Sequence, residues 1–268
     1  MVGTALAFVK RDFLQDISYK GPFAFRLAAI LFWVPVMYFV SGVFEGTASA
    51  FLKPYGGGYF PFLLIGVALL DYHALSLQIF SNSIRESQMM GTLEIMLLSP
   101  TRLPAMIIYS SLWGYIFTSF RFILYLLAGS FLFNLNLGNA NLPAASVVLL
   151  LSIVCFAGLG ITLASFIVLL KQAGSLDLFL RSASLLLGGV VYPIEVLPEW
   201  LRQASFVIPI TYSLSAMRLT LLQGYSLGQV RLDVLALVTF SVVFLPVGLL
   251  AFHFAVQRVK HTGTLGHY

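Results

Sequence analysis

Three ionisable residues within apolar sequence are the first candidates for chemistry in this chain. Asp71 and His73 lie in an apolar stretch near 60–82, and Arg121 lies in the next one, near 104–133. A charge at the centre of a membrane helix costs roughly 2.5–3.5 kcal/mol, so it needs a partner or water. Four uses are open: an Asp71–Arg121 ion pair joining two helices, a polar patch on a substrate path, a proton relay through His73, or acid–base catalysis by Asp71 and His73.

Depth in the membrane supports the ion pair. Asp71 lies about 11 residues from the expected outer end of its helix, which is about 17 Å at the helical rise. Arg121 lies about 12 residues from the outer end of the neighbouring helix, or about 18 Å. The two charges therefore fall at nearly the same depth, and we expect them to pair.

Composition places the chain in a membrane. It is 59% hydrophobic and only 9% charged, whereas soluble domains carry roughly 25% charged residues. The formal net charge of +5 does not indicate a nucleic acid partner, because no basic stripe with interleaved aromatic residues is present. The single cysteine, Cys155, excludes an intrachain disulfide. The four histidines are scattered, so we expect no metal site; they lie at positions 73, 253, 261 and 267.

The apolar stretches predict an all-α integral membrane protein with six transmembrane helices in one domain, residues 1–268. A spanning helix needs about 20 residues. The expected spans lie near 23–44, 60–82, 104–133, 143–170, 177–193 and 232–256.

Residues 5–19 predict an amphipathic helix that lies on the membrane surface. Leu6, Val9, Phe13 and Ile17 recur at helical spacing, and charged or amide residues occupy the other side. Such a helix binds the interface with its apolar face.

The distribution of Lys and Arg predicts the orientation. Basic residues gather before the first span, around 85–102, at 171–181 and after the last span, whereas the loop at 134–142 has no charge. Basic loops stay on the cytoplasmic side. We therefore expect a multi-pass protein of the cell (inner) membrane with both termini in the cytoplasm.

The segment 84–98 lies between the second and third spans and reads as a short amphipathic helix. Its apolar side contrasts with Glu86 and Glu94, which together with Arg85 can form charge-assisted bonds to a soluble partner. The alternative is a solvated helix that only links two spans.

The segment 194–222 cannot be one continuous helix, because Pro198 and Pro209 interrupt it after Pro193. It is nevertheless too apolar for a free loop. We expect a re-entrant helical hairpin in the outer leaflet, with Trp200 and Tyr212 at the interface. An extracellular amphipathic cap is the alternative.

Glycines provide two further signals. Gly42 and Gly46 form a G-x-x-x-G pattern at the outer end of the first span, and Gly188-Gly189 lies in the fifth. Both patterns permit close helix approach at a dimer interface.

Two motifs give the chain a family resemblance. Arg85-Glu86, followed by Gly91-Thr92-Leu93-Glu94 and Ser99-Pro100, resembles the "RE…GTLE…L…P" segment of ABC-2 type transporter permeases. The run 188–201 is similar to their "G…P…LP.WL" signature, and Pro209-Ile210-Thr211-Tyr212 with Arg218 is similar to "NP.TY…..R". The chain departs from the family at Ile208, where Asn is common, and at Met89-Met90, which replaces a charged pair.

The resemblance implies the type V ABC exporter fold and a half-transporter. Two copies, as a homodimer, would pair in the lipid membrane, each with a cytoplasmic ABC ATPase subunit. The helix at 84–98 would be the coupling helix; its expected partner-binding residues are Arg85, Glu86, Thr92, Leu93 and Glu94. The expected residues of the substrate pathway and gate are Asp71, His73, Arg121, Tyr192, Pro193, Trp200 and Tyr212.

No phosphate-binding loop is present, because the pair Gly-Lys occurs nowhere in the chain. We therefore expect no cofactor here and no enzymatic activity, with ATP and Mg bound by the partner. The expected function is outward transport of an amphiphilic substrate: a drug, lipid, glycolipid or lipid-linked glycan. The alternatives are an intramembrane enzyme acting on a lipid-linked substrate and a passive channel.

Overall fold

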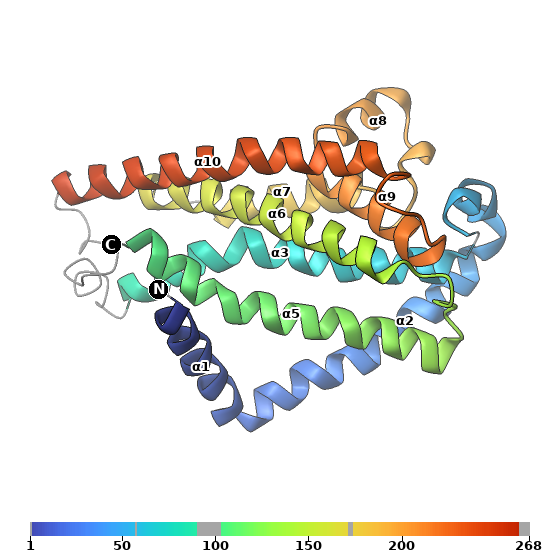
Figure 1. Cartoon of the computed structure of the whole chain (residues 1–268), viewed down its shortest axis with the longest axis horizontal. Helices are drawn as coiled ribbons and strands as arrows, with labels where there is room; N and C mark the ends of the chain where they lie inside the picture. Colours follow the sequence, from blue (N-terminus) through green and yellow to red (C-terminus); the bar gives the residue numbers. More distant parts are fainter. Residues whose placement is uncertain (1, 57, 90–102, 171–173, 263–268) are drawn as a thin grey trace.

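The computed structural model describes residues 2–56, 58–89, 103–170 and 174–262, which form helices and connecting turns without a strand. The long helices run side by side along the longest axis (Figure 1). The elements are α1 (Val2–Ser18), α2 (Lys20–Leu52), η1 (Lys53–Tyr55), α3 (Tyr59–Met89), α5 (Leu103–Phe133), α6 (Leu142–Leu170), α7 (Gly174–Leu187), η2 (Ile194–Val196), α8 (Glu199–Ser205), α9 (Pro209–Leu222) and α10 (Arg231–Thr262).

Within the described ranges, five helices are long and apolar enough to cross a membrane: α2, α3, α5, α6 and α10. They confirm five of the expected spans. The pair α8 and α9 is bent by 85° at a short break, which makes it a candidate for a broken span or a re-entrant segment. The prolines explain the break, because Pro198 precedes α8 and Pro209 begins α9. The chain is thus a multi-pass, all-helical membrane protein.

The expected fifth span, near 177–193, differs from the structure. Helix α7 has 14 residues and ends at Leu187, so it is about 21 Å long, shorter than the hydrocarbon core of about 30 Å. The chain turns at Gly189, whose φ of +76° favours glycine. Pro193 then takes an extended conformation before η2. The glycine pair that we placed inside a span therefore ends the helix.

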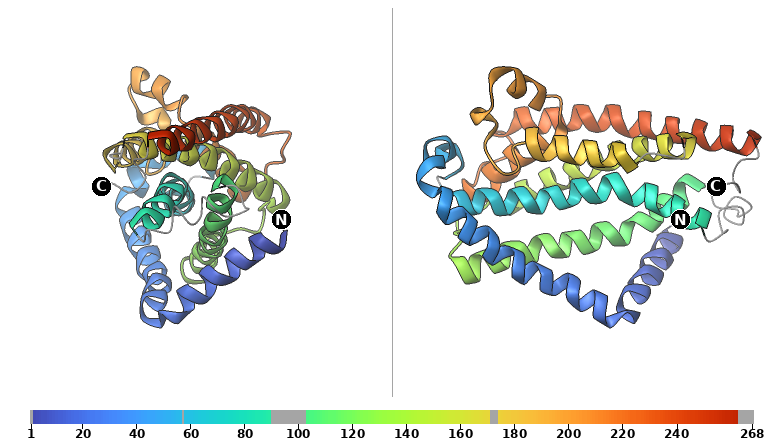
Figure 2. Two further views of the ribbon diagram at one scale, coloured as in Figure 1. Left: turned by 90° about the vertical axis from the view of Figure 1, so that its left-hand side faces the viewer. Right: turned by 180° about the vertical axis from the view of Figure 1, so that it is seen from behind.

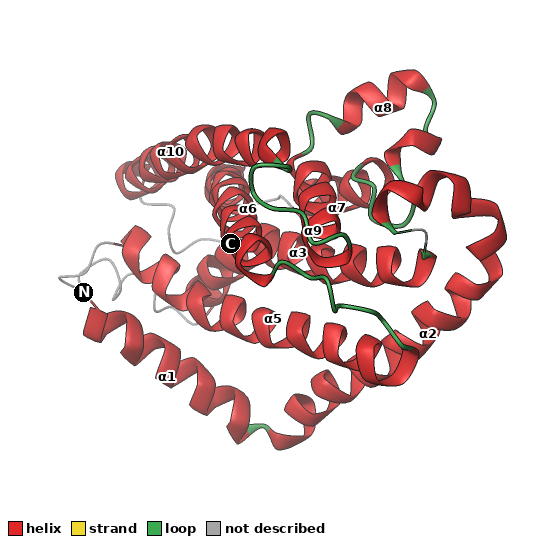
Figure 3. Ribbon diagram, turned by 45° about the vertical axis from the view of Figure 1, so that its right-hand side comes forward, coloured by secondary structure: helices red, strands yellow, loops and turns green. Residues whose placement is uncertain are grey.

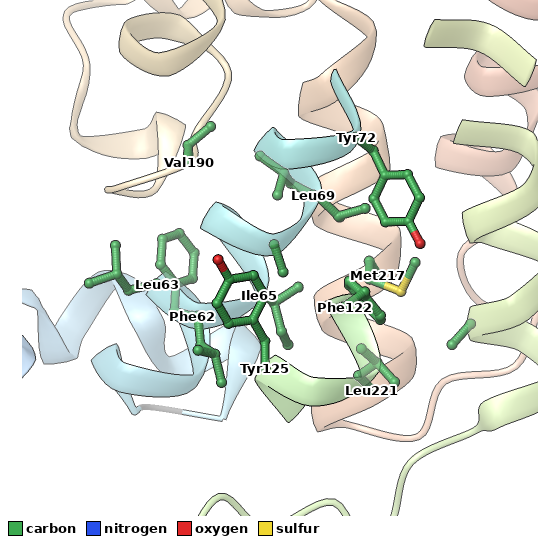
Figure 4. Packing of buried hydrophobic residues seen from close by; sticks show 14 of the residues in the cluster. Phe62, Leu63, Ile65, Leu69, Tyr72, Phe122, Tyr125, Val190, Met217 and Leu221 are labelled. Atoms are coloured by element: carbon green, nitrogen blue, oxygen red, sulfur yellow. The ribbon is translucent and has the colours of Figure 1, made fainter. Parts of the chain in front are cut away.

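Helix α3 is the central element of the bundle. It packs against α2, α5, α6, α7 and α9, and it is the most buried of the five candidate spans. Figure 4 shows side chains of its first half, among them Phe62 and Leu69, in one cluster with Phe122 of α5 and Met217 of α9. Because α3 touches so many neighbours, each polar residue along it meets a different environment.

Among the described residues, helices α6 and α10 form the most extensive helix–helix contact. A Cβ on Gly158 of α6 would lie 2.7 Å from the backbone nitrogen of Leu245, and one on Gly248 of α10 would lie 2.7 Å from the carbonyl oxygen of Gly158. Small residues at these positions let the two backbones approach, as is usual in membrane bundles.

Helix α1 crosses the bundle instead of running along it, and α1, α2 and α5 enclose a triangular outline (Figures 1 and 2). Leu6, Phe13 and Ile17 are exposed on its apolar face. Asp16 on the polar face accepts hydrogen bonds from Arg26 of α2 and from the indole of Trp113 of α5, both at 2.7 Å. The predicted amphipathic helix is confirmed as a helix; its place on the membrane stays a prediction.

The bundle has two distinct ends. The beginning of α1, the end of α3, the beginning of α5 and the end of α10 lie together at one end, which we call the α1 end (Figure 1). Segment η1, the α5–α6 loop and the turn between α9 and α10 lie at the other, the η1 end. Helix α8 stands away from the bundle beside the η1 end (Figure 3).

Candidate functional site

The expected ion pair within the bundle is present. Arg121 Nη2 of α5 lies 2.7 Å from Asp71 Oδ2 of α3. The Tyr125 hydroxyl lies between the two groups: Arg121 donates to it at 3.1 Å, and it donates to Asp71 at 3.4 Å. The side chains of Arg121 and Asp71 keep 29% and 27% of their surface exposed. The pair is therefore only partly buried, and both side chains remain accessible at the surface of the bundle.

Hydroxyl groups extend the polar contact between α3 and α5 toward the α1 end. Tyr72 donates to Ser119 at 2.9 Å, and the hydroxyls of Ser76 and Tyr115 are 2.8 Å apart. These side chains satisfy one another inside the helix pair. They hold the two helices in the register that brings Asp71 to Arg121.

His73 lies in a different environment from Asp71. It is 3% exposed, its Nε2 is 2.8 Å from the hydroxyl of Ser184 on α7, and its ring packs edge-on against Phe156 of α6. Residues two apart on a helix point to nearly opposite sides. An acid–base pair needs hydrogen-bond reach. Here the two side chains have different partners, Arg121 and Ser184, so the geometry does not support joint action of Asp71 and His73 on one substrate.

Helix α7 adds charged residues beside α3. Gln78 of α3 donates to Asp177 of α7 at 2.7 Å. Arg181, one turn further along α7, has an attractive coulombic interaction with Asp71. Asp71 thus interacts mainly with Arg121 of α5 and more weakly with Arg181 of α7.

A polar stripe follows one face of α3. Asp71, Gln78, Asn82 and Glu86 are separated by seven, four and four residues, a spacing that places them on the same side of a helix. Asp71 and Gln78 are half-buried, and Asn82 and Glu86 are exposed. We call these four residues the α3 stripe. It leads from the α1 end of the helix to the Asp71–Arg121 pair.

The expected coupling helix, 84–98, is described only in its first part. Residues 84–89 continue α3 without a break, so the segment does not begin as a separate helix. Arg85 and Glu86 are exposed at the α1 end. Thr92, Leu93 and Glu94 lie outside the described residues.

Arg218 of α9 is a structural anchor whose role the sequence did not reveal. It is 2% exposed, and it donates to the carbonyl oxygens of Phe62, Gly189 and Val190 at 2.8–3.2 Å. Its guanidinium also lies 3.3 Å from the centre of the Phe62 ring. The lone arginine in an apolar helix was the available signal.

The expected gate residues lie away from the ion pair, near the turn at Gly189 and Val190 that Arg218 binds. The hydroxyl of Tyr192 donates to Leu186 O at 2.6 Å, and that of Tyr212 donates to Phe206 O at 3.0 Å. Pro193 is buried, and Trp200 on α8 is exposed. The seven expected pathway and gate residues thus fall into three separate groups. Asp71 and Arg121 form the ion pair, His73 contacts Ser184, and the other four lie near the turn.

A cavity of about 200 Å³ opens beside this turn. Tyr55, Glu195, Tyr212, Ser215 and Asp233 contribute polar groups to its wall. Ser215 donates to Asp233 at 2.9 Å. Burial, with a further contribution from the charge of Glu195, raises the pKa of Tyr55 above its usual value, so the phenol stays neutral.

Among the described residues, no group of three His, Cys, Asp or Glu side chains could hold a metal ion. The model of the ABC-2 type transporter family matches residues 5–222, from α1 through α9. No curated protein matches the chain.

Proposed function

We propose, from the premise that this chain belongs to the ABC-2 type transporter family, that this membrane permease exports an amphiphilic substrate with ATP hydrolysed by a separate subunit. The family match establishes the permease. The chain has no Gly-Lys pair and so no phosphate-binding loop. We infer that the energy comes from a separate ABC ATPase subunit.

The working assembly that we propose contains two permease copies and two cytoplasmic ABC ATPase subunits, in the cell (inner) membrane. Both permease termini face the cytoplasm. The exposed end of α3, with Arg85 and Glu86, continues into the segment that carries Thr92, Leu93 and Glu94. Closure of the ATPase pair pushes on this segment, and because α3 is one uninterrupted helix from Tyr59 to Met89, the displacement reaches the bundle centre.

The half-exposed Asp71–Arg121 pair is the observation that supports a substrate path. Lipid tails would not solvate these charges, whose exposed surface must meet water or protein. The α3 stripe continues this polar surface toward the α1 end. We place the path along the α3 stripe, between the two copies, so that a polar headgroup passes over Asp71 while the tails stay in apolar surroundings.

The outer gate in this proposal is the segment from Tyr192 to Tyr212. Arg218 attaches the turn just before this segment, at Gly189 O and Val190 O, to the beginning of α3, at Phe62 O. A movement of α3 is therefore transmitted directly to the turn. The exposed Trp200 on α8 lies at the free edge of the gate.

Two variants test the coupling. In proteoliposomes that contain the permease and its ATPase, Glu94→Arg should weaken copurification of the ATPase and abolish ATP-driven export. Arg231→Glu, a charge reversal at the exposed beginning of α10, is the control and should leave both unchanged. Full ATPase binding and full export in Glu94→Arg would contradict the coupling assignment.

The enzyme and channel alternatives have their own test. Replacing Asp71 and His73 by alanine should leave some ATP-dependent export in a permease, whereas an enzyme would lose all turnover. Flux in the absence of nucleotide and ATPase would indicate a channel.

A further inference from the structure

A large cavity lies at the α1 end, away from the gate. Its volume is about 710 Å³, within the range of about 300–1,000 Å³ typical of small-molecule sites. It lies where α1 crosses the bundle, between α1, α3 and α5. We call it the α1 cavity.

Its wall is made by one face of each helix. Helix α1 contributes residues at positions 8, 11, 12, 15 and 16, and α3 contributes positions 75, 78, 79, 82, 83 and 86. These spacings follow the helical repeat, so the faces are continuous. The polar face of α1 thus turns toward the cavity while its apolar face is exposed to the surroundings. This is the placement of a pocket at headgroup level beneath an interfacial helix.

The charges in the wall favour a cationic ligand. Both arginines are already paired: Arg11 with Asp12 at 2.7 Å and Arg26 with Asp16 at 2.7 Å. Both oxygens of Asp16 already accept a hydrogen bond, one from Arg26 and one from Trp113. Glu86 has no hydrogen-bond or ion-pair partner among the described residues, and three carboxylates face two guanidinium groups. The wall therefore carries one more carboxylate than guanidinium groups. A cation would find unused oxygens on Asp12 and Glu86, whereas an anion would meet this excess of negative charge.

The wall also contains apolar and aromatic surface for the rest of a ligand. Phe8, Leu75, Ile79, Met106 and Trp113 lie between the polar groups. Aromatic faces attract cations, and the aliphatic side chains accept a hydrocarbon tail. Three residues of the α3 stripe, Gln78, Asn82 and Glu86, line the same cavity. A ligand held there is therefore already on the face of α3 that leads to Asp71.

We infer that the α1 cavity is the loading site of the permease and that it takes an amphiphile with a protonated amine or similar cationic, hydrogen-bond-donating head. This inference rests on the proposed export function and specifies its substrate class. Asp12 and Glu86 receive the head, Phe8 and Trp113 flank it, and the α3 stripe carries it toward the ion pair.

Fluorescence of Trp113 tests the inference directly. The chain has three tryptophans, and the exposed Trp33 and Trp200 are replaced by phenylalanine, so that Trp113 reports alone. The full-length permease in lipid nanodiscs, without nucleotide, is titrated with dodecylammonium, dodecyl sulfate and dodecyl maltoside. We expect a saturable change with dodecylammonium, at an affinity at least about tenfold higher than for the other two.

Variants locate the response. Asp12→Asn should weaken dodecylammonium binding by about tenfold, the usual size of one charge-assisted hydrogen bond. Asn82→Phe, at an exposed position of the wall, should fill the cavity and abolish binding. Arg231→Gln removes a charge from the exposed beginning of α10, outside the cavity wall, and should change nothing.

Equal responses to the three amphiphiles, or a response that survives Asn82→Phe, would overturn the loading site. The assay needs neither ATP nor the ATPase, so it is independent of the export measurement. Loss of binding specificity alongside intact ATP-driven export would refute only this site. Specific binding without any export would instead refute the proposed function.

Discussion

Asp71 of α3 and Arg121 of α5 are joined twice, once by direct contact at 2.7 Å and once through the hydroxyl of Tyr125, which accepts from the guanidinium and donates to the carboxylate. The two charges compensate each other within the apolar bundle. Because both side chains stay partly exposed, they also remain open to a third polar group. The pair can therefore stabilise the bundle and act on a substrate headgroup.

A double-mutant cycle should separate these roles. Asp71→Asn and Arg121→Gln each leave one charge without its partner, so each single variant should melt at a lower temperature than the double variant. We expect a coupling energy of about 1 kcal/mol, because the pair is partly exposed. Thermal unfolding in detergent measures it.

The export assay completes the cycle. A double variant that regains stability but not ATP-driven export would show that the charges act on the substrate. Recovery of both would assign the pair a structural role only, and strict additivity of the two single effects would contradict the ion pair itself.

Arg218→Lys should destabilise the permease strongly. Lysine presents a compact ammonium group and cannot reproduce the planar guanidinium that reaches Phe62 O, Gly189 O and Val190 O together. Losing hydrogen bonds from a charged donor should cost about 2–3 kcal/mol. Denaturant unfolding monitored by tryptophan fluorescence provides the measurement.

Arg231→Lys is the matched control for Arg218→Lys, because Arg231 is exposed at the beginning of α10. It should stay within about 0.5 kcal/mol of the parent protein. Equal effects of the two variants would argue against the anchor.

Gly66→Ala should destabilise the turn that Arg218 holds. A Cβ at Gly66 of α3 would collide with the carbonyl oxygen of Val190 and lie 2.7 Å from Arg218 Nη2. The backbone must shift, at a cost of about 1–3 kcal/mol. A lower melting temperature and loss of export should accompany the change.

Gly42→Ala serves as the control, because a Cβ at Gly42 meets no atom within 4 Å in the isolated chain. It should not lower the stability of the monomer. If Gly42 and Gly46 pack against a second copy, Gly42→Leu should shift the permease from dimer to monomer in size-exclusion chromatography, and an unchanged dimer would remove this G-x-x-x-G from the interface.

Asp16→Asn should loosen α1. Asp16 accepts from Arg26 and Trp113, which tie α1 to α2 and α5. Weakening two hydrogen bonds to a charged acceptor should raise amide hydrogen exchange in α1 by about tenfold or more. Lys10→Gln, at an exposed position on α1, is the control and should leave exchange unchanged.

Local features of the sequence determined much of this architecture. The length of the apolar stretches predicted α2, α3, α5, α6 and α10, because a membrane of fixed thickness demands helices of a certain length. The prolines at 198 and 209 predicted the bend between α8 and α9, because proline cannot continue a helix. Depth counting predicted the Asp71–Arg121 pair, because helical rise is constant.

Contacts between distant segments were decided only by the tertiary structure. The same counting could not show that His73 would face Ser184 and not Asp71, since this depends on how α7 packs against α3. It could not show that α7 ends at Leu187. Just after this end, the carbonyl groups of Gly189 and Val190 accept hydrogen bonds from Arg218, which lies 29 and 28 residues further along the chain. Periodicity and length are properties of one helix, whereas partners and cavities depend on the rotation of helices about one another, which side-chain packing fixes only in the assembled bundle.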